Sequence, residues 1–181
     1  MVSIFLDFVN SRYYNTHPPF QDGLSDPEWI WRFVQNYELD IPLADFLQYQ
    51  DDIINLRELM FCITERIEEN GLVSAEDLHR INHFMKKVHL IFEMELTPIG
   101  YHTIFIPVEP GIACLYFQVT AAFSGLLAKG NLYRLKLCKN PACQLAFHDN
   151  SKNNSRKWCG NTCASLVKVR NYRKRMRHQT K

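Results

Sequence analysis

Four cysteines near the C-terminus constrain the fold of this chain more than any other feature. Four residues separate Cys138 from Cys143, three separate Cys159 from Cys163, and a fifteen-residue arm joins the two pairs. Thiolates are soft ligands that suit zinc, and two short chelating pairs on a longer arm are typical of a structural zinc site. The spacing therefore predicts one Zn²⁺ held by these four sulfurs. The alternatives are two disulfides or four separate buried thiols.

The residues around each pair suit this role. Asn140 and Pro141 are turn formers that would bring both sulfurs of the first pair onto one metal. Cys163 begins a helix-compatible segment, whose N-terminus favours the thiolate form. Cys62 and Cys114 lie on apolar helical faces and are predicted to be small buried hydrophobes.

Four thiolates also fill the coordination shell of zinc, which leaves no position for water or substrate. The sequence contains no Ser/His/Asp order, phosphate loop or dinucleotide fingerprint. We therefore expect that the protein is not an enzyme.

Charge divides the chain into two parts of opposite sign. Residues 1–130 carry 8 Lys/Arg against 18 Asp/Glu, a net charge of −10, whereas residues 131–181 carry 13 Lys/Arg against the single acid Asp149, a net charge of +12. This division predicts two domains, 1–130 and 131–181. The basic domain is expected to bind polyanions such as nucleic acid.

The N-terminus has no basic start or small-residue cleavage site, and no apolar run reaches the roughly 20 residues that span a bilayer. We therefore expect a cytoplasmic protein with no membrane partner. In that reducing compartment a cysteine cluster favours metal over disulfide.

Hydrophobic periodicity and turn residues predict a mainly α fold with one short β-hairpin. Asp26 before Pro27, and Ser74 with Asp77, are helix-starting signals, and Asn70-Gly71 is a stop signal. The predicted helices cover residues 27–37, 42–69, 74–88 and 111–129, the last of them central and buried, and a strand or hairpin is predicted within 97–110.

A basic helix is predicted beyond the last cysteine. Leu166, Val169 and Tyr172 follow a helical stripe, and no acid is interleaved among the cations. The residues expected to contact nucleic acid are Lys168, Arg170, Arg173, Lys174, Arg175 and Arg177 on this helix, with Arg156 and Lys157 beside the metal. Such contacts would release counterions, so binding should weaken steeply with salt.

These residues together resemble the CGNR zinc-finger family of bacterial proteins, in which an α-rich N-terminal domain called ABATE precedes a treble-clef-like zinc finger. The resemblance covers nearly the whole chain. It is carried by residues 6–11 (LDFVNS), 22–27 (DGLSDP) with Trp31, 56–59 (LREL), the cysteine frame with 147–151 (FHDNS), 156–159 (RKWC), and the basic helix.

The resemblance implies a stress-induced transcription regulator whose finger binds DNA and whose N-terminal domain senses a small-molecule effector or a stress signal. Our leading hypothesis is that the acidic helical domain senses this effector, forms a homodimer or restrains the finger. The alternative is a zinc-stabilised RNA- or protein-interaction module. The Gly-Asn-Arg that names the family is replaced after the last cysteine by Ala164-Ser165-Leu166. This departure affects the DNA site carried over from the family and leaves the metal site intact.

Asp7, Asn10 and Arg57 match polar motif positions of the family and have mostly apolar neighbours. The resemblance implies a ligand pocket at these residues. The alternative is that they hydrogen-bond one another and lock the helices together, because buried polar groups need partners.

Overall fold

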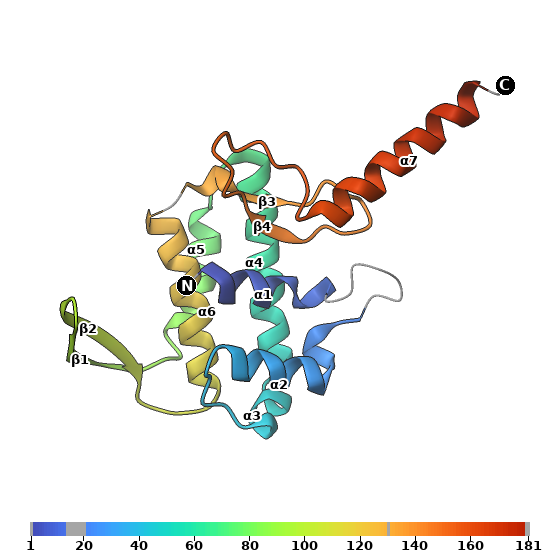
Figure 1. Cartoon of the computed structure of the whole chain (residues 1–181). Coiled ribbons are helices and arrows are strands. Elements are labelled where there is room, and N and C mark those ends of the chain that lie inside the picture. Colours follow the sequence, from blue (N-terminus) through green and yellow to red (C-terminus); the bar gives the residue numbers. More distant parts are fainter. Residues whose placement is uncertain (1, 14–20, 130, 180–181) are drawn as a thin grey trace.

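The computed structural model describes residues 2–13, 21–129 and 131–179. It contains a helical body, which ends with the helix at residues 112–129, followed by a small finger that begins at residue 131 and a long terminal helix over residues 161–179 (Figure 1). The mainly α prediction is confirmed. In chain order the elements are α1 (Val2–Asn10), η1 (Ser11–Tyr13), η2 (Gly23–Ser25), α2 (Pro27–Asn36), α3 (Leu43–Gln48), α4 (Gln50–Asn70), α5 (Ala75–Met85), β1 (Leu90–Thr97), β2 (Gly100–Pro107), α6 (Ile112–Lys129), η3 (Leu132–Arg134), β3 (Leu135–Leu137), β4 (Ala146–His148) and α7 (Asn161–Gln179).

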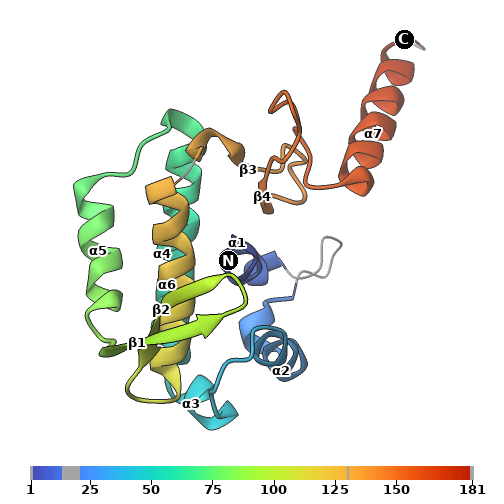
Figure 2. The ribbon, with the colours of Figure 1, turned by 60° about the vertical axis from the view of Figure 1, so that its left-hand side comes forward.

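The core of the body lies where α1 packs across α4 and α6 (Figure 2). Phe5 of α1 stacks on Phe123 of α6 with ring centroids 5.0 Å apart. α5 covers the other side of α4 and α6. The fully buried side chains of this core include Phe5, Phe8, Leu56, Met60, Ile63, Leu115 and Phe123.

The predicted helix signals are found in the structure. The Asp26 side chain accepts a hydrogen bond from the amide of Glu28 at 3.0 Å, and Pro27 begins α2. Ser74 and Asp77 form a reciprocal capping box at α5. Gly71 ends α4 with a φ of 74°, a left-handed conformation that glycine adopts without strain.

The single helix predicted over 42–69 is wrong, because the chain changes direction at Tyr49. The Tyr49 amide donates to the Asp45 carbonyl and ends α3, while its own carbonyl accepts from Ile53 and begins α4. Apolar spacing continues through this bend, so periodicity does not reveal it. Leu47, which helical spacing over 42–69 would place on the apolar face, is exposed.

Two further differences concern single segments. The hairpin is longer than predicted, since residues 90–97 form β1 and pair with β2 in antiparallel register from Leu90↔Pro107 to Thr97↔Gly100. Cys62 was predicted to be buried but is exposed, because it lies on the outer side of α4 between the buried Phe61 and Ile63.

The finger packs directly on the body. The predicted domain boundary falls at Gly130, outside the described residues, and β3 and β4 then form an antiparallel pair. Leu135 and Ala146 are buried in the same apolar core as α1 and α4. The side chain of Asn10 donates to the Ala146 carbonyl and accepts from the Ala146 amide, both at 2.8 Å.

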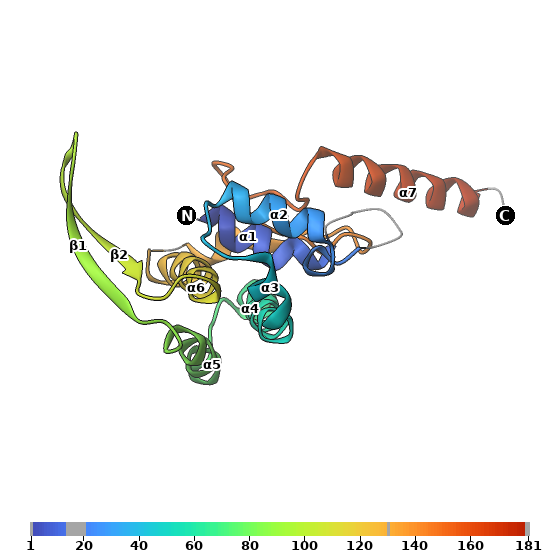
Figure 3. The same ribbon diagram turned by 90° about the horizontal axis from the view of Figure 1, so that it is seen from below.

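The β1–β2 hairpin and the helix α7 project from this body. The β1–β2 hairpin and α7 extend to opposite sides of the molecule (Figure 3). Within the described residues, no helix has the length and apolar character needed to cross a bilayer.

Candidate metal centre and its basic helix

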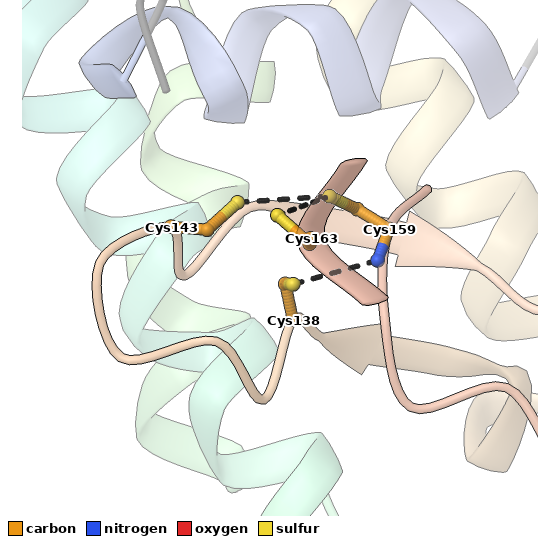
Figure 4. Close-up of side chains that lie close together, drawn as sticks. All are labelled: Cys138, Cys143, Cys159 and Cys163. Carbon is orange, nitrogen blue, oxygen red and sulfur yellow. Dashed lines mark hydrogen bonds between the residues drawn. The ribbon is translucent and has the colours of Figure 1, made fainter. Parts of the chain in front are cut away.

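The four predicted ligands converge on one point (Figure 4). Cys138 follows β3, Cys143 precedes β4, Cys159 lies just before α7, and Cys163 lies in the first turn of α7. All four sulfurs lie within 4.8 Å of one another. The Cys143–Cys159 and Cys159–Cys163 sulfur pairs are 3.6 and 3.7 Å apart. Tetrahedral zinc with Zn–S bonds of about 2.3 Å requires sulfurs about 3.8 Å apart.

Hydrogen bonds from neighbouring groups orient the sulfurs. The side-chain amide of Asn140 donates to Cys163 Sγ at 3.3 Å, and the backbone amide of Cys159 donates to Cys138 Sγ at 3.4 Å. Asn140 is buried, and its Oδ1 accepts from the Ala142 amide, which tightens the first knuckle. Such bonds fix ligand orientation at metal sites. The sequence marked Asn140 as a turn residue and did not reveal its contact with sulfur.

The sulfurs also shift one another's acidity. The hydrogen bond with Cys159 lowers the pKa of Cys143 to about 5. The same bond, together with burial, raises the pKa of Cys159. Four thiolates placed this close repel one another, and a divalent cation relieves that repulsion as it displaces the thiol protons. The geometry and the donor set therefore fit one structural zinc ion.

Asp149, the single acid of the finger, anchors the loop between β4 and Cys159. It is fully buried and accepts from Lys136 Nζ at 2.8 Å and from the amides of Ser151 and Arg156 at 2.9 and 2.8 Å. Burial raises its pKa, but these hydrogen bonds outweigh that effect and hold the pKa well below its usual range. Arg134 donates to the carbonyls of Asp149 and Ser151 and closes the same loop.

The predicted cations Arg156 and Lys157 lie where this loop meets α7. The Arg156 guanidinium sits over the Phe147 ring, 5.2 Å from its centroid, and donates to the Cys159 carbonyl at 2.6 Å. Arg156 and Lys157, together with Gly160, Asn161 and Ala164 of the helix start, line a shallow cavity of about 210 Å³. Ala164 stands in the position where the Gly-Asn-Arg motif would begin.

The other predicted cations lie on α7, which leaves the finger at Cys163 and extends away from the body (Figure 1). All six, Lys168, Arg170, Arg173, Lys174, Arg175 and Arg177, are exposed. The apolar stripe of Leu166, Val169 and Tyr172 is exposed as well. The helix therefore presents both its charged and its apolar side to solvent.

The residues predicted to bind a ligand are distributed over two places. Asp7 and Asn10 line a cavity of about 380 Å³ between α1, α2 and Leu145 of the finger, with Trp29 and Tyr37 among its walls. Asp7 accepts from the Tyr37 hydroxyl at 2.5 Å. Burial and this hydrogen bond raise the pKa of Tyr37 to about 12.

Arg57 lies elsewhere, buried in α4, where its two terminal nitrogens contact the Asp22 carboxylate at 2.5 and 2.8 Å. Asp22 also accepts from the Leu24 amide, so Arg57 fixes the loop that leads into α2. Gly23 beside it has no room for a side chain, because a Cβ would lie 2.7 Å from the Trp29 ring. Each of the three predicted residues therefore has its own partner: Tyr37, Ala146 or Asp22.

Comparison with known protein families agrees with this geometry for the finger. The sequence model of the CGNR zinc finger matches residues 134–176, which span the four cysteines and most of α7. A search of curated proteins found no match. The finger is thus a zinc-binding module of the CGNR type, and the match does not extend to the helical body.

Proposed function

We propose that the protein is a cytoplasmic regulator of transcription that binds DNA through α7. The observation that carries this proposal is the continuity between metal site and helix. Cys163 is a zinc ligand in the first turn of α7, and every Lys and Arg from Lys168 to Arg177 is exposed beyond it. The zinc then has a structural role: it fixes the direction in which the basic helix α7 leaves the finger.

Electrostatics supports a polyanion as the partner. α7 has 19 residues and is therefore about 28 Å long. It carries no acid, and none of the ion pairs formed by the described residues involves it. The acidic body lies away from the helix, so its charge leaves the cations accessible (Figure 2).

The cavity beside Arg156 and Lys157 extends this surface to the N-terminus of α7. A phosphate there would meet cations and the free amides of the first helical turn. Because phosphate contacts carry no sequence information, we assign these residues to positioning. Sequence preference would have to come from arginines of α7 that reach guanine edges.

We further propose that the cavity lined by Asp7 and Asn10 is the effector site of the body. Leu145 of the finger forms part of its wall, and Asn10 binds the backbone of β4. A small molecule bound there would contact the body and the finger at once. The aromatic side chains of Trp29 and Tyr37 and the polar side chains of Asp7 and Asn10 line this cavity. Such a lining suits a small, partly apolar ligand with hydrogen-bonding groups.

The test is the salt dependence of binding to duplex DNA by the full-length protein, followed by fluorescence anisotropy. If six cations of α7 contact phosphates, log K should fall with log salt with a slope of about −5. The double variant Arg170→Gln/Arg173→Gln should reduce the slope by about 2. The charge-matched control Arg80→Gln/Lys86→Gln, on exposed positions at α5, should keep the wild-type slope. Equal effects of the two variants would contradict the assignment to α7.

A second candidate is an RNA- or protein-interaction module, favoured by the exposed stripe of Leu166, Val169 and Tyr172 on the same helix. Competition between duplex DNA, structured RNA and single strands separates these functions. Selection from a random duplex library, with and without zinc, tests for a preferred sequence. A library that yields no zinc-dependent enrichment would move the assignment to the interaction module.

A further inference from the structure

The β1–β2 hairpin exposes one continuous apolar face. Cross-strand partners point to the same side of a hairpin, and the register pairs Phe92 with Phe105, Met94 with Thr103 and Leu96 with Tyr101. The large apolar residues of this face are Leu90, Phe92, Met94, Leu96, Tyr101 and Phe105, and they are 41% to 75% exposed. We call these six residues the hairpin face.

The hairpin face is too large for an ordinary solvent-facing surface. A fully exposed large apolar side chain presents about 200 Å², so these six leave on the order of 800 Å² in contact with water. The largest apolar patch on a typical monomer is about 300–600 Å². A two-stranded hairpin is also only marginally stable without a layer packed on it. The chain itself provides no such layer over this face among the described residues.

The size and charge of the face identify its occupant. An area of about 800 Å² per partner is what a standard stable protein interface buries. The hairpin face carries no charged side chain, whereas Glu93 and Glu95 lie on the opposite side of β1. Two copies can therefore meet face to face across a twofold axis without opposing like charges. The exposed stripe of α7 fits less well, because it would bring arginines to a face without carboxylates.

We infer that the hairpin face packs against the hairpin face of a second copy of this chain. The two hairpins form a small two-layer β-sandwich, with their apolar side chains interdigitated between the layers. The hairpin projects on the side opposite α7, so both basic helices stay free in this dimer (Figure 3). The inference rests on the hairpin alone and does not depend on nucleic-acid binding.

The test is sedimentation of the full-length protein over a wide range of concentration. The wild type should sediment as a dimer of the 21.3 kDa chain. Phe92→Lys/Met94→Lys should weaken dimerisation at least about 30-fold, since two central apolar side chains are replaced. Glu93→Lys/Glu95→Lys places the same two lysines on the opposite side of the same strand and should leave the dimer intact.

Phe92 and Met94 are 73% and 75% exposed, so both variants should fold, with melting curves that match the wild type. A wild type that is monomeric at every concentration would overturn the inference, and so would a monomer that binds phosphatidylcholine vesicles through this face. Equal loss of the dimer in both double variants would overturn the assignment to the hairpin face.

Discussion

The body and the finger are held together by different means. The body buries a continuous apolar core, contributed mainly by α1, α2, α4, α5 and α6, to which the finger adds Leu135 and Ala146. The finger has a separate cluster that consists of three cysteines and Phe147, with Leu145, Trp158 and Cys159 packed against it. A segment this short cannot bury enough apolar surface to fold alone, and a metal supplies what the core lacks. Zinc and an apolar core thus perform the same structural task in two parts of one chain.

Removal of one zinc ligand should have the largest effect, and only on the finger. Cys143→Ser should abolish stoichiometric zinc and unfold the finger, because structural zinc contributes on the order of 10 kcal/mol to a small finger. Metal analysis and hydrogen exchange should show loss of zinc and of protection over 138–163, with α4 and α6 still protected. Cys62→Ser, at an exposed thiol outside the cluster, is the control. Retained zinc with unchanged exchange would contradict the metal assignment.

A substitution that creates a cavity in the core of the body should destabilise the body and leave the zinc site of the finger intact. Phe123 is fully buried against Phe5, so Phe123→Ala should lower the free energy of unfolding by about 3–5 kcal/mol. The folded variant should keep its zinc. Urea unfolding measures the change, and Leu72→Ala, at a side chain that is 70% exposed, should change stability little. Loss of zinc from the folded Phe123 variant would show that the two parts do not hold their structure separately.

The junction between the two parts can be tested at Asn10. Asn10→Ala leaves the buried amide and carbonyl of Ala146 without their partner and should cost about 1–3 kcal/mol. Hydrogen exchange at the Ala146 amide should accelerate while the four-cysteine site keeps zinc. Asn36→Ala removes a second amide from the same cavity and serves as the control. An Ala146 amide that exchanges at the wild-type rate would refute the role of Asn10.

The smallest effect is a pH dependence within the body. Burial raises the pKa of Asp77, but hydrogen bonds from Ser74 and the ion pair with Arg66 lower it below its ordinary value of 3.8. The stability contributed by Asp77 is therefore present above pH 4 and is lost as the pH falls through the folded-state pKa. Asp77→Asn should cost about 1 kcal/mol at pH 7, because the ion pair with Arg66 is lost, and almost nothing near pH 2, where the Asp77 carboxylate is protonated. A Glu69→Gln control should show no such convergence in urea titrations at the two pH values.

Local signals allowed much of this fold to be predicted. The Asp26 cap, the Ser74 and Asp77 box and the Gly71 stop each act within a few residues, so the sequence alone reveals them. The four cysteines are equally local in their pairs, and thiolate chemistry then determines the site. The exposure of the α7 cations follows from the number of Lys and Arg residues within a short segment that has no acid, because burying so many unpaired positive charges would be too costly.

Other features depend on partners distant in sequence and could not be read from the pattern. Arg57 pairs with Asp22, 35 positions away, and no periodicity connects them. The alternation of Glu93 and Glu95 with apolar residues is local and favours a strand, but the register of β1 on β2 depends on residues up to 17 positions away (Leu90↔Pro107). The bend at Tyr49 leaves apolar spacing unchanged. The side chains of the hairpin face are apolar, and apolar side chains of this size usually lie in the core. Their exposure is the reason why we infer a partner for this face.

The bond between Asn10 and Ala146 also sets an order of events during synthesis. The two residues are 136 positions apart, and a ribosome adds roughly 5–20 residues per second, so α1 leaves the tunnel on the order of 10 s before its partner strand exists. For most of that interval Phe5 lacks its stacking partner, because Phe123 of α6 lies 118 positions after it (123 minus 5). α1 therefore completes its contacts late in synthesis, and a nascent chain stalled before α6 would expose the apolar side chains of α1 to chaperones.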